Sequence, residues 1–189
     1  MWARPARTSA GAAPTRSVRR RRKRLPDALR APRLYGLAAA AAVFAADQAT
    51  KLWVLAAHAG LPVEVLPFFN IVLVWNRGVS FGMFGAAGPL LLAAIGAAVA
   101  VVLVVWMLRS HRRFEALALG AVAGGAAGNI LDRLTRGAVV DFLDFHIGGW
   151  HWYAFNLADS AITVGVAMLL FETLFGRGRR AGETGGGKG

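Results

Sequence analysis

The chain has 189 residues, 56% of them apolar, with a net charge of +12 and a mean hydropathy of +0.48. A soluble domain of this length is rarely so apolar, and the long uninterrupted apolar runs place the chain among membrane proteins. The absence of cysteine excludes disulfides, thiolate metal sites and cysteine nucleophiles, and the histidines lack ligand spacing, so we expect no metal site.

Residues 1–33 are rich in arginine, proline and alanine, and Arg19–Arg24 form an unbroken basic run. Such a run repels itself and buries nothing, so we expect a disordered cytoplasmic tail attracted to anionic lipid head groups. Nucleic-acid binding is the weaker alternative, because the excess charge lies at the two ends of the chain. A signal peptide cleaved near Ala57–Gly60 is another, against which Asp47 and Lys51 argue by interrupting its apolar core.

Four apolar segments follow, each about 18–24 residues long. That length is enough to cross a hydrocarbon core of roughly 30 Å at about 1.5 Å per residue. The third segment is marginal in length and contains many glycines. We therefore predict an all-α membrane protein with a small β element, its four transmembrane helices lying at about 34–57, 88–108, 114–131 and 158–175.

The positive charges predict the orientation of these helices. Residues 1–33, the linker 109–113 and the residues after Phe175 hold eighteen of the twenty-two lysines and arginines. Because cytoplasmic loops carry the excess of basic residues, both termini are expected in the cytoplasm. We predict a tail over 1–33, a four-helix membrane domain over 34–175 and a second flexible tail over 176–189.

Two segments would then face outward, and both contain strand-like stretches. Residues 63–74, 139–145 and 150–155 are rich in β-branched and aromatic residues, which predicts short strands in a small sheet on the membrane surface. Aromatic side chains that favour the membrane–water interface lie near the same boundary. They are Trp53, Trp75, Trp150, Trp152 and Tyr153.

Ionisable residues interrupt these segments, where each costs about 2.5–3.5 kcal/mol on insertion scales. Asp47 and Lys51 lie one helical turn apart and can pair. Asp132 and Arg133 stand at the end of the third segment, where we expect them to pair with each other, and Asp159 stands at the start of the fourth. All lie toward the outer boundary of the membrane, so we treat them as candidates for a functional site. An ion pair that only orients the first helix is the alternative for Asp47 and Lys51.

Small and polar residues accompany these charges. Gly120, Gly124 and Gly128 recur every four residues, which allows a neighbouring helix to approach closely. Asn129 follows directly and is expected to scaffold a site with the charged pair or merely to cap the bundle. Asn156 can cap the fourth helix. Four polar residues share one face at the start of that helix: Asn156, Asp159, Ser160 and Thr163.

Asp141 lies in a strand-like outer segment that joins the outer ends of the third and fourth helices. Alone it would be an ordinary surface acid, but this connection can bring it close to Asp159. Two carboxylates that share a site cannot both ionise easily, so one becomes an acid and the other a base. That is the chemistry of an aspartyl hydrolase with a water between the carboxylates. We expect Asp159, near a helix N-terminus, to be the base and Asp141 to be the acid.

These motifs resemble those of the lipoprotein signal peptidases, or type II signal peptidases, over most of residues 34–175. Each motif is short, but five of them occur in order at matching places in four helices. The matching stretches are Asp47-Gln48 with Lys51, residues 76–82 (NRGVSFG), 124–133 (GGAAGNILDR), 139–142 (VVDF) and 155–160 (FNLADS).

The resemblance implies a membrane aspartyl endopeptidase with Asp141 and Asp159 as its catalytic pair. It implies cleavage of prolipoproteins before a diacylglyceryl-modified cysteine, at the outer face of the bacterial cytoplasmic (inner) membrane, without a cofactor. It also implies inhibition by the cyclic peptide globomycin, and a β-cradle made by the outer segments. Site support or substrate binding is implied for Asp47, Lys51, Asn76, Gly128, Asn129, Asp132, Arg133 and Asn156.

Two features depart from the family pattern. The long basic tail has no role in it, and a misassigned start codon at Met1 would explain that tail. Val79-Ser80 stand where many members have two alanines. Two rival functions are a small ion- or proton-coupled transporter and a non-enzymatic assembly factor. Transport sites lie near the midplane between repeats, whereas this chain has no repeat and its acids lie toward one side.

The charge distribution gives the first testable prediction. Reporter fusions after Arg112 and after Phe175 are expected to report the cytoplasm, and a fusion near Gly148 is expected to report the outside. A C-terminal reporter on the outer side would contradict the four-helix topology.

Overall fold

The structure, a computed structural model, describes residues 27–78 and 88–175. The predicted tails upstream of Asp27 and downstream of Phe175 lie outside the described residues, as does the stretch 79–82 of the second motif. The helices are α1 (Asp27–Ala56), α2 (Gly88–Arg109), α3 (Arg113–Arg136) and α4 (Leu157–Phe175). Helix α1 therefore begins upstream of its predicted start at Leu34, and the prediction that the disordered tail extends to residue 33 is wrong for residues 27–33, which are helical.

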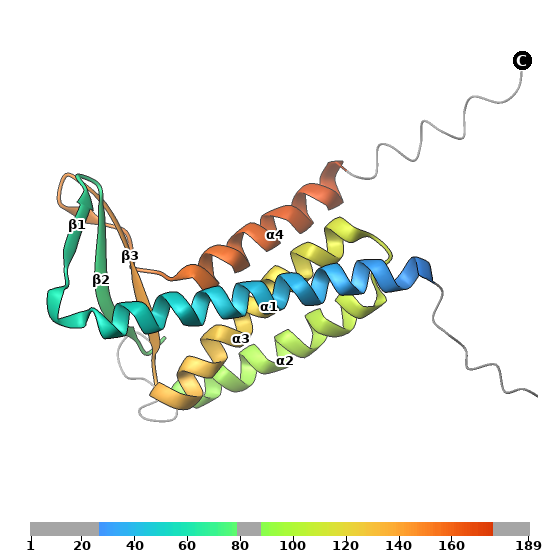
Figure 1. Cartoon of the computed structure of the whole chain (residues 1–189), viewed down its shortest axis with the longest axis horizontal. Coiled ribbons are helices and arrows are strands. Elements are labelled where there is room, and N and C mark those ends of the chain that lie inside the picture. The colour runs from blue at the N-terminus through green and yellow to red at the C-terminus, as the bar shows by residue number, and fades with distance from the viewer. Residues whose placement is uncertain (1–26, 79–87, 176–189) are drawn as a thin grey trace, which may run out of the picture.

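The four helices form a bundle with a small sheet at one end (Figure 1). The start of α1 and the end of α4 both lie at the opposite end. Helices α2, α3 and α4 are each long and apolar enough to cross a membrane. Helix α1 has 30 residues but carries Asp47, Gln48 and Lys51 in its second half, which lower its hydropathy. Its crossing of the membrane stays a prediction.

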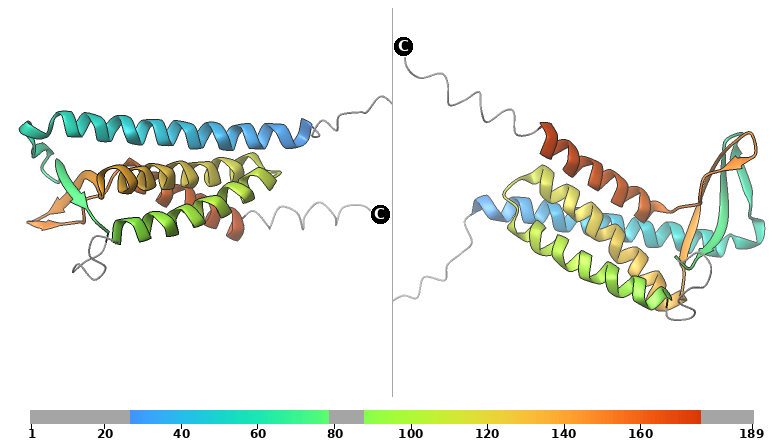
Figure 2. Two further views of the ribbon diagram at one scale, coloured as in Figure 1. Left: turned by 90° about the horizontal axis from the view of Figure 1, so that it is seen from below. Right: turned by 180° about the vertical axis from the view of Figure 1, so that it is seen from behind.

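Helix α3 is the centre of the bundle and packs against α1, α2 and α4 (Figure 2). Its glycines make this possible, as predicted. A Cβ atom at Gly120 would collide with the backbone of Gly36, and one at Gly124 would collide with the backbone of Ala40. Gly125 faces α4 in the same way, since a Cβ there would lie 2.6 Å from the carbonyl oxygen of Ala158. Backbone contact on both sides brings the polar residues of α1 and α4 to α3.

The sheet has four antiparallel strands in the order β1-β2-β3-β4. They are β1 (Val63–Leu66), β2 (Phe69–Asn76), β3 (Val139–Ile147) and β4 (Trp150–His151). The predicted strands over 63–74 and 139–145 are confirmed. The prediction over 150–155 is wrong for most of its length, because the chain leaves the sheet after His151 to enter α4 and pairs again only at Phe155.

One turn and three backbone hydrogen bonds place β3 between the end of α3 and the start of α4. Gly137 ends α3 with a φ of 71°, a left-handed conformation that suits glycine, and the chain turns directly into β3. The amides of Phe142 and Leu143 both donate to the carbonyl oxygen of Phe155, at 3.0 and 2.8 Å, and the Phe155 amide donates to Leu143 at 3.1 Å. Residue 156, which precedes α4, is therefore held beside residue 141 of β3.

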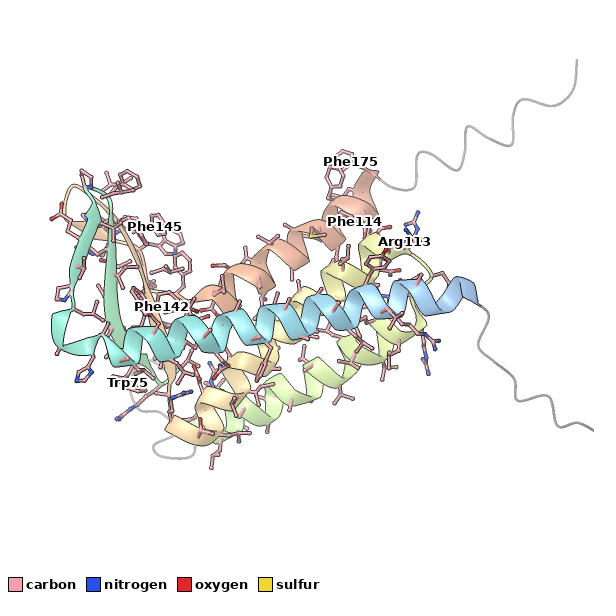
Figure 3. The ribbon with its side chains drawn as sticks, viewed as in Figure 1. Trp75, Arg113, Phe114, Phe142, Phe145 and Phe175 are labelled. Atoms are coloured by element: carbon pink, nitrogen blue, oxygen red, sulfur yellow. The ribbon has the colours of Figure 1, made fainter. Side chains whose placement is uncertain are left out.

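Large aromatic side chains surround the sheet end. Trp75, Phe142 and Phe145 lie at this end of the molecule, whereas Arg113, Phe114 and Phe175 lie at the other (Figure 3). The five aromatic residues predicted to favour the interface are all exposed, from 47% for Trp75 to 92% for Tyr153. Their position in a membrane remains a prediction.

Candidate active site

A fully buried lysine connects α1 to α3 at the sheet end of the bundle. The Lys51 ammonium lies 2.8 Å from Asp47 Oδ2 and 2.9 Å from Asp132 Oδ2. It also donates a hydrogen bond of 3.0 Å to Asn129 Oδ1. Lys51, Asp47 and Asp132 are each 0% exposed. A buried ammonium has to satisfy all three of its donors, and here each donor has an oxygen within hydrogen-bond distance.

The pairing of Asp47 with Lys51 is confirmed, and Asp47 also reaches α4. Its Oδ1 accepts a hydrogen bond of 3.0 Å from the backbone amide of Ala158, in the first turn of that helix. Gln48 donates to Asp47 Oδ2 at 3.1 Å. A side chain at Gly128 would collide with Asp47 Oδ2, so the glycine makes room for this carboxylate. One aspartate thus links α1 to both α3 and α4.

Asp132 pairs with residues other than its neighbour in sequence. Its Oδ1 forms an ion pair with Arg136, and its Oδ2 accepts a hydrogen bond of 3.3 Å from the Val140 amide. The expectation that Asp132 pairs with Arg133 is wrong, because adjacent helical residues point in different directions. Arg133 instead donates to the carbonyl oxygen of Asn129 at 3.2 Å, and its Nε atom is buried without a hydrogen-bond partner among the described residues.

The orientation of two asparagine side chains follows from the lysine. An ammonium group can only donate, so Asn129 must turn its carbonyl oxygen toward Lys51 and its NH₂ group the other way. That NH₂ group donates to Asp159 Oδ1 at 2.8 Å. Asn156 also donates to Asn129 Oδ1, at 3.2 Å, and its other N–H donates to Asp141 Oδ1 at 2.7 Å. The charge of Lys51 therefore orients Asn129, and each carboxylate of the predicted pair accepts a hydrogen bond from an asparagine NH₂ group.

Asp141 is 1% exposed and accepts two amide hydrogen bonds. Asn156 donates to Oδ1, and Asn76, at the end of β2, donates to Oδ2 at 2.8 Å. Burial raises the pKa of Asp141 to about 6; the hydrogen bond from Asn76 lowers this pKa, and the charge of Asp159 raises it. The upward shift agrees with the expected acid, although burial and not the second carboxylate is its main cause.

Asp159 and Asn156 cap α4 reciprocally. Asn156 Oδ1 accepts the Asp159 amide at 2.9 Å, and Asp159 Oδ2 accepts the Asn156 amide at 3.3 Å. The predicted cap at Asn156 is confirmed, with Asp159 in the role of the acidic partner of a capping box. Ser160 and Thr163, the other two residues of the predicted polar face, donate their hydroxyls to carbonyl oxygens one turn earlier.

All ten residues predicted from the sequence lie at the sheet end, and contacts connect them. Asn156 touches both Asp141 and Asp159, Asn76 touches Asp141 and Asn129 touches Asp159. Asp47 and Asp132 hold Lys51, which bonds Asn129. Arg136 and Gln48 were not predicted. Arg136 lies four residues after Asp132, the spacing that identified Asp47 and Lys51, so the same rule would have found it. Gln48 stands in the first motif of the family resemblance but was not among the predicted site residues.

The arrangement suits acid–base chemistry on a neutral substrate. The four carboxylate oxygens of Asp141 and Asp159 accept hydrogen bonds from neutral amides, and carboxylates have lone pairs left for a water. In the parts of the chain that the structure describes, no group of three or more histidine, cysteine, aspartate or glutamate side chains is placed to hold a metal ion. The site consists of charges and amides at the end of a helical bundle.

Helices able to cross a membrane, with a buried acid–amide site at one end, define an integral membrane enzyme. A solved bacterial membrane enzyme has the same fold, with a TM-score of 0.68 and 30% identity over 74% of this chain and 92% of that one. A second solved bacterial membrane enzyme aligns with a TM-score of 0.65 and 29% identity, covering 81% of this chain and 91% of the other.

The chain belongs to the Signal peptidase (SPase) II family, which matches residues 39–175. A lipoprotein signal peptidase from Methylobacterium sp. (strain 4-46) is 47% identical over 154 residues, covering 78% of this chain and 93% of that protein. Another from Rhodopseudomonas palustris (strain ATCC BAA-98 / CGA009) is 47% identical over 152 residues, covering 75% of this chain and 92% of its own length. The chain is therefore a multi-pass membrane protease of the aspartic type, and neither the transporter nor the non-enzymatic assembly factor is supported.

The buried charge cluster yields a stability prediction. Lys51→Met is expected to lower the free energy of unfolding by about 3–5 kcal/mol, because Asp47 and Asp132 would remain buried without their shared cation. Thermal unfolding in detergent measures this. The control is Arg112→Gln, which breaks the partly exposed pair with Glu172 and is expected to cost no more than about 1 kcal/mol. Equal stability of the two variants would contradict a structural role for the lysine.

Proposed function

We propose that the chain removes the signal peptide from prolipoproteins, cutting just before a diacylglyceryl-modified cysteine, with Asp141 and Asp159 as the catalytic pair. The observation that carries this proposal is the single asparagine that contacts both carboxylates. Asn156 donates to Asp141 through its side chain and exchanges two hydrogen bonds with Asp159. Two acids held by one residue are positioned to share one water and one peptide bond.

The proposed reaction uses the different surroundings of the two acids. Asp159 takes a proton from the water, whose oxygen attacks the carbonyl carbon of the scissile bond. Asp141, whose pKa is raised to about 6, gives its proton to the carbonyl oxygen as the tetrahedral intermediate forms. The proton held by Asp159 then passes to the leaving nitrogen while the carbon–nitrogen bond breaks. One hydroxyl of the intermediate returns its proton to Asp141 in the same step, so the product is a carboxylic acid and both aspartates regain their starting states. Two carboxylates and a water complete this cycle without a cofactor.

The amides hold the two carboxylates in place while the protons are exchanged. Asn129 and Asn156 donate to the carboxylates from the helix side, and Asn76 donates from the end of β2. Neutral donors stabilise a carboxylate without holding it as firmly in the ionised state as a cation would. Lys51 donates a hydrogen bond to Asn129, so the charge of Lys51 acts on the catalytic pair through this asparagine.

The proposed membrane placement has four spans, including α1, with both termini in the cytoplasm. Helix α1 packs along α3 over much of its length, which supports a shared direction across the bilayer. The start of α1 and the end of α4 lie at the same end of the bundle (Figure 1), away from the sheet. The site would then lie at the outer face of the bacterial inner membrane, where the substrate's acyl chains leave the scissile bond at the boundary.

The same family relationship supports two further proposals about ligands. We expect the sheet to cradle the prolipoprotein chain above the membrane, and globomycin to inhibit cleavage by occupying the same site. Membrane lipids surround the bundle in this placement, since the exposed surfaces of α2 and α4 are largely apolar.

Substitution of either acid tests the pair. Asp141→Asn and Asp159→Asn are each expected to lower cleavage of a lipidated prolipoprotein by at least about a hundredfold, because each removes one proton-transfer group. The fold and substrate binding should persist, since asparagine keeps the shape of both side chains. Asp144→Asn is the matched control, because Asp144 is a buried acid on the same strand that bonds Asn70 and His151. Near-normal turnover at position 141 or 159 would remove the aspartyl mechanism.

The pH dependence follows from the pKa of Asp141. If Asp141 acts as the acid, it must be protonated, so kcat/KM is expected to fall as the pH rises through about 6. Asn76→Ala removes a hydrogen bond that favours the ionised form, so this limb should move to higher pH by about one unit. The control Asn70→Ala removes a similar bond to Asp144 on the same strands and should leave the limb in place. An unshifted limb in Asn76→Ala would show that another group controls it.

A further inference from the structure

Three arginines at the sheet end of the bundle line one cavity. Only four of the twenty-two basic residues lie outside the two ends of the chain and the linker 109–113. One of them, Lys51, is buried in the charge cluster described above. The other three, Arg77, Arg133 and Arg136, are all part of the wall of a cavity of about 790 Å³. Apart from the buried Lys51, all lysines and arginines at the sheet end therefore line the same cavity.

The cavity lies where three segments meet: the end of β2, the start of α2, and the end of α3 with the turn that follows it. Trp75, Leu90 and Leu134 contribute an apolar wall. Trp75 is seen beside the end of α3 in Figure 3. Positive charge on one side and apolar surface on the other make the cavity amphipathic.

The positive charge of the cavity is only partly neutralised. None of its lining residues is acidic, but the charges of Asp159, Asp141 and Asp132 act on Arg133 from outside the cavity. Arg136 pairs with Asp132, but Arg77 and Arg133 form no ion pair with any residue that the structure describes. The segment 79–87, which connects β2 to α2, contains no aspartate or glutamate and so brings no counter-charge. The Nε atom of Arg133 is buried and has no hydrogen-bond partner among the described residues.

The chemistry and the depth of the cavity indicate its ligand. Guanidinium groups bind phosphate oxygens with paired hydrogen bonds, and several together select an anion. The apolar span of α2 begins at Gly88 and that of α3 ends at Arg136, so the cavity lies at the level of lipid head groups. Basic residues are scarce on the outer side of membrane proteins, which makes three in one cavity a feature that needs a function.

We propose that this cavity binds the phosphate group of an anionic phospholipid, with the lipid's acyl chains along Trp75, Leu90 and Leu134. The arginines would hold the head group while the apolar wall receives the start of the chains. This inference rests on the proposed membrane placement of α2 and α3, and it does not depend on the catalytic pair.

Retention of lipid by the purified full chain tests the proposal. Native mass spectrometry in detergent compares binding of phosphatidylglycerol with that of zwitterionic phosphatidylcholine, and inorganic phosphate is added as a competitor. The chain is expected to retain phosphatidylglycerol preferentially, and Arg77→Gln is expected to weaken this binding by about fivefold or more. The matched control is Arg109→Gln, an exposed arginine at the other end of α2, which should bind as the unaltered chain does.

Four outcomes would overturn the proposal. Arg77→Gln could bind phosphatidylglycerol as well as the unaltered chain, or both arginine variants could lose it equally, which would indicate general surface attraction. Inorganic phosphate at millimolar concentration could displace the lipid, which would indicate a site for a free anion. Retention is also measured in Asp141→Asn. Unchanged retention there supports the lipid site whatever the fate of the catalytic pair, and its loss would show that the cavity depends on that pair and overturn the proposal.

Discussion

The arrangement of the site depends on one buried ammonium group. Lys51 touches two aspartates and one asparagine, and its contacts with Asp132 and Asn129 connect α1 to α3. Removing an ammonium from water costs several kcal/mol unless its partners compensate, and here two carboxylates and an amide oxygen do so. Because the ammonium accepts no hydrogen bond, it also decides which way Asn129 points, and through Asn129 which way Asn156 points. Removal of the charge would take away the charged donor that Asn129 Oδ1 faces.

The close packing of the helices is the second constraint, because it sets how near the side chains of α1 and α3 can come. A lysine in α1 reaches α3 only because Gly120 and Gly124 let the two backbones touch, and Gly128 leaves the space that Asp47 occupies. The sheet then supplies Asp141 and Asn76, since the turn at Gly137 returns the chain directly from α3 into β3. Helix packing and strand pairing thus bring the site residues together at the sheet end of the bundle. The acids at this point are enclosed by the sheet end of the bundle, with Asp141 buried and Asp159 partly buried.

Much of this could be predicted from the sequence, and the limits are physical. The helices follow from apolar length, and the pair Asp47–Lys51 follows from helical spacing. The glycine row follows from its period of four. The partner of Asp132 was mistaken because adjacency was weighed above the i,i+4 rule that favours Arg136. The strand after Trp150 was overestimated because β-propensity does not reveal where a chain must leave a sheet. The amide orientations depend on contacts between three helices and a strand, which no local pattern contains.

The reciprocal cap at the start of α4 makes one carboxylate serve two purposes. Asp159 Oδ2 holds the Asn156 amide, so the same atom that belongs to the proposed catalytic pair also ties down the first turn of a helix. A protonated carboxyl is a weaker acceptor than a carboxylate. Under the proposed mechanism, each turnover would therefore loosen and retighten the end of α4. The end of α4 would relax while Asp159 carries the proton, and it would tighten again once the proton has passed to the leaving nitrogen.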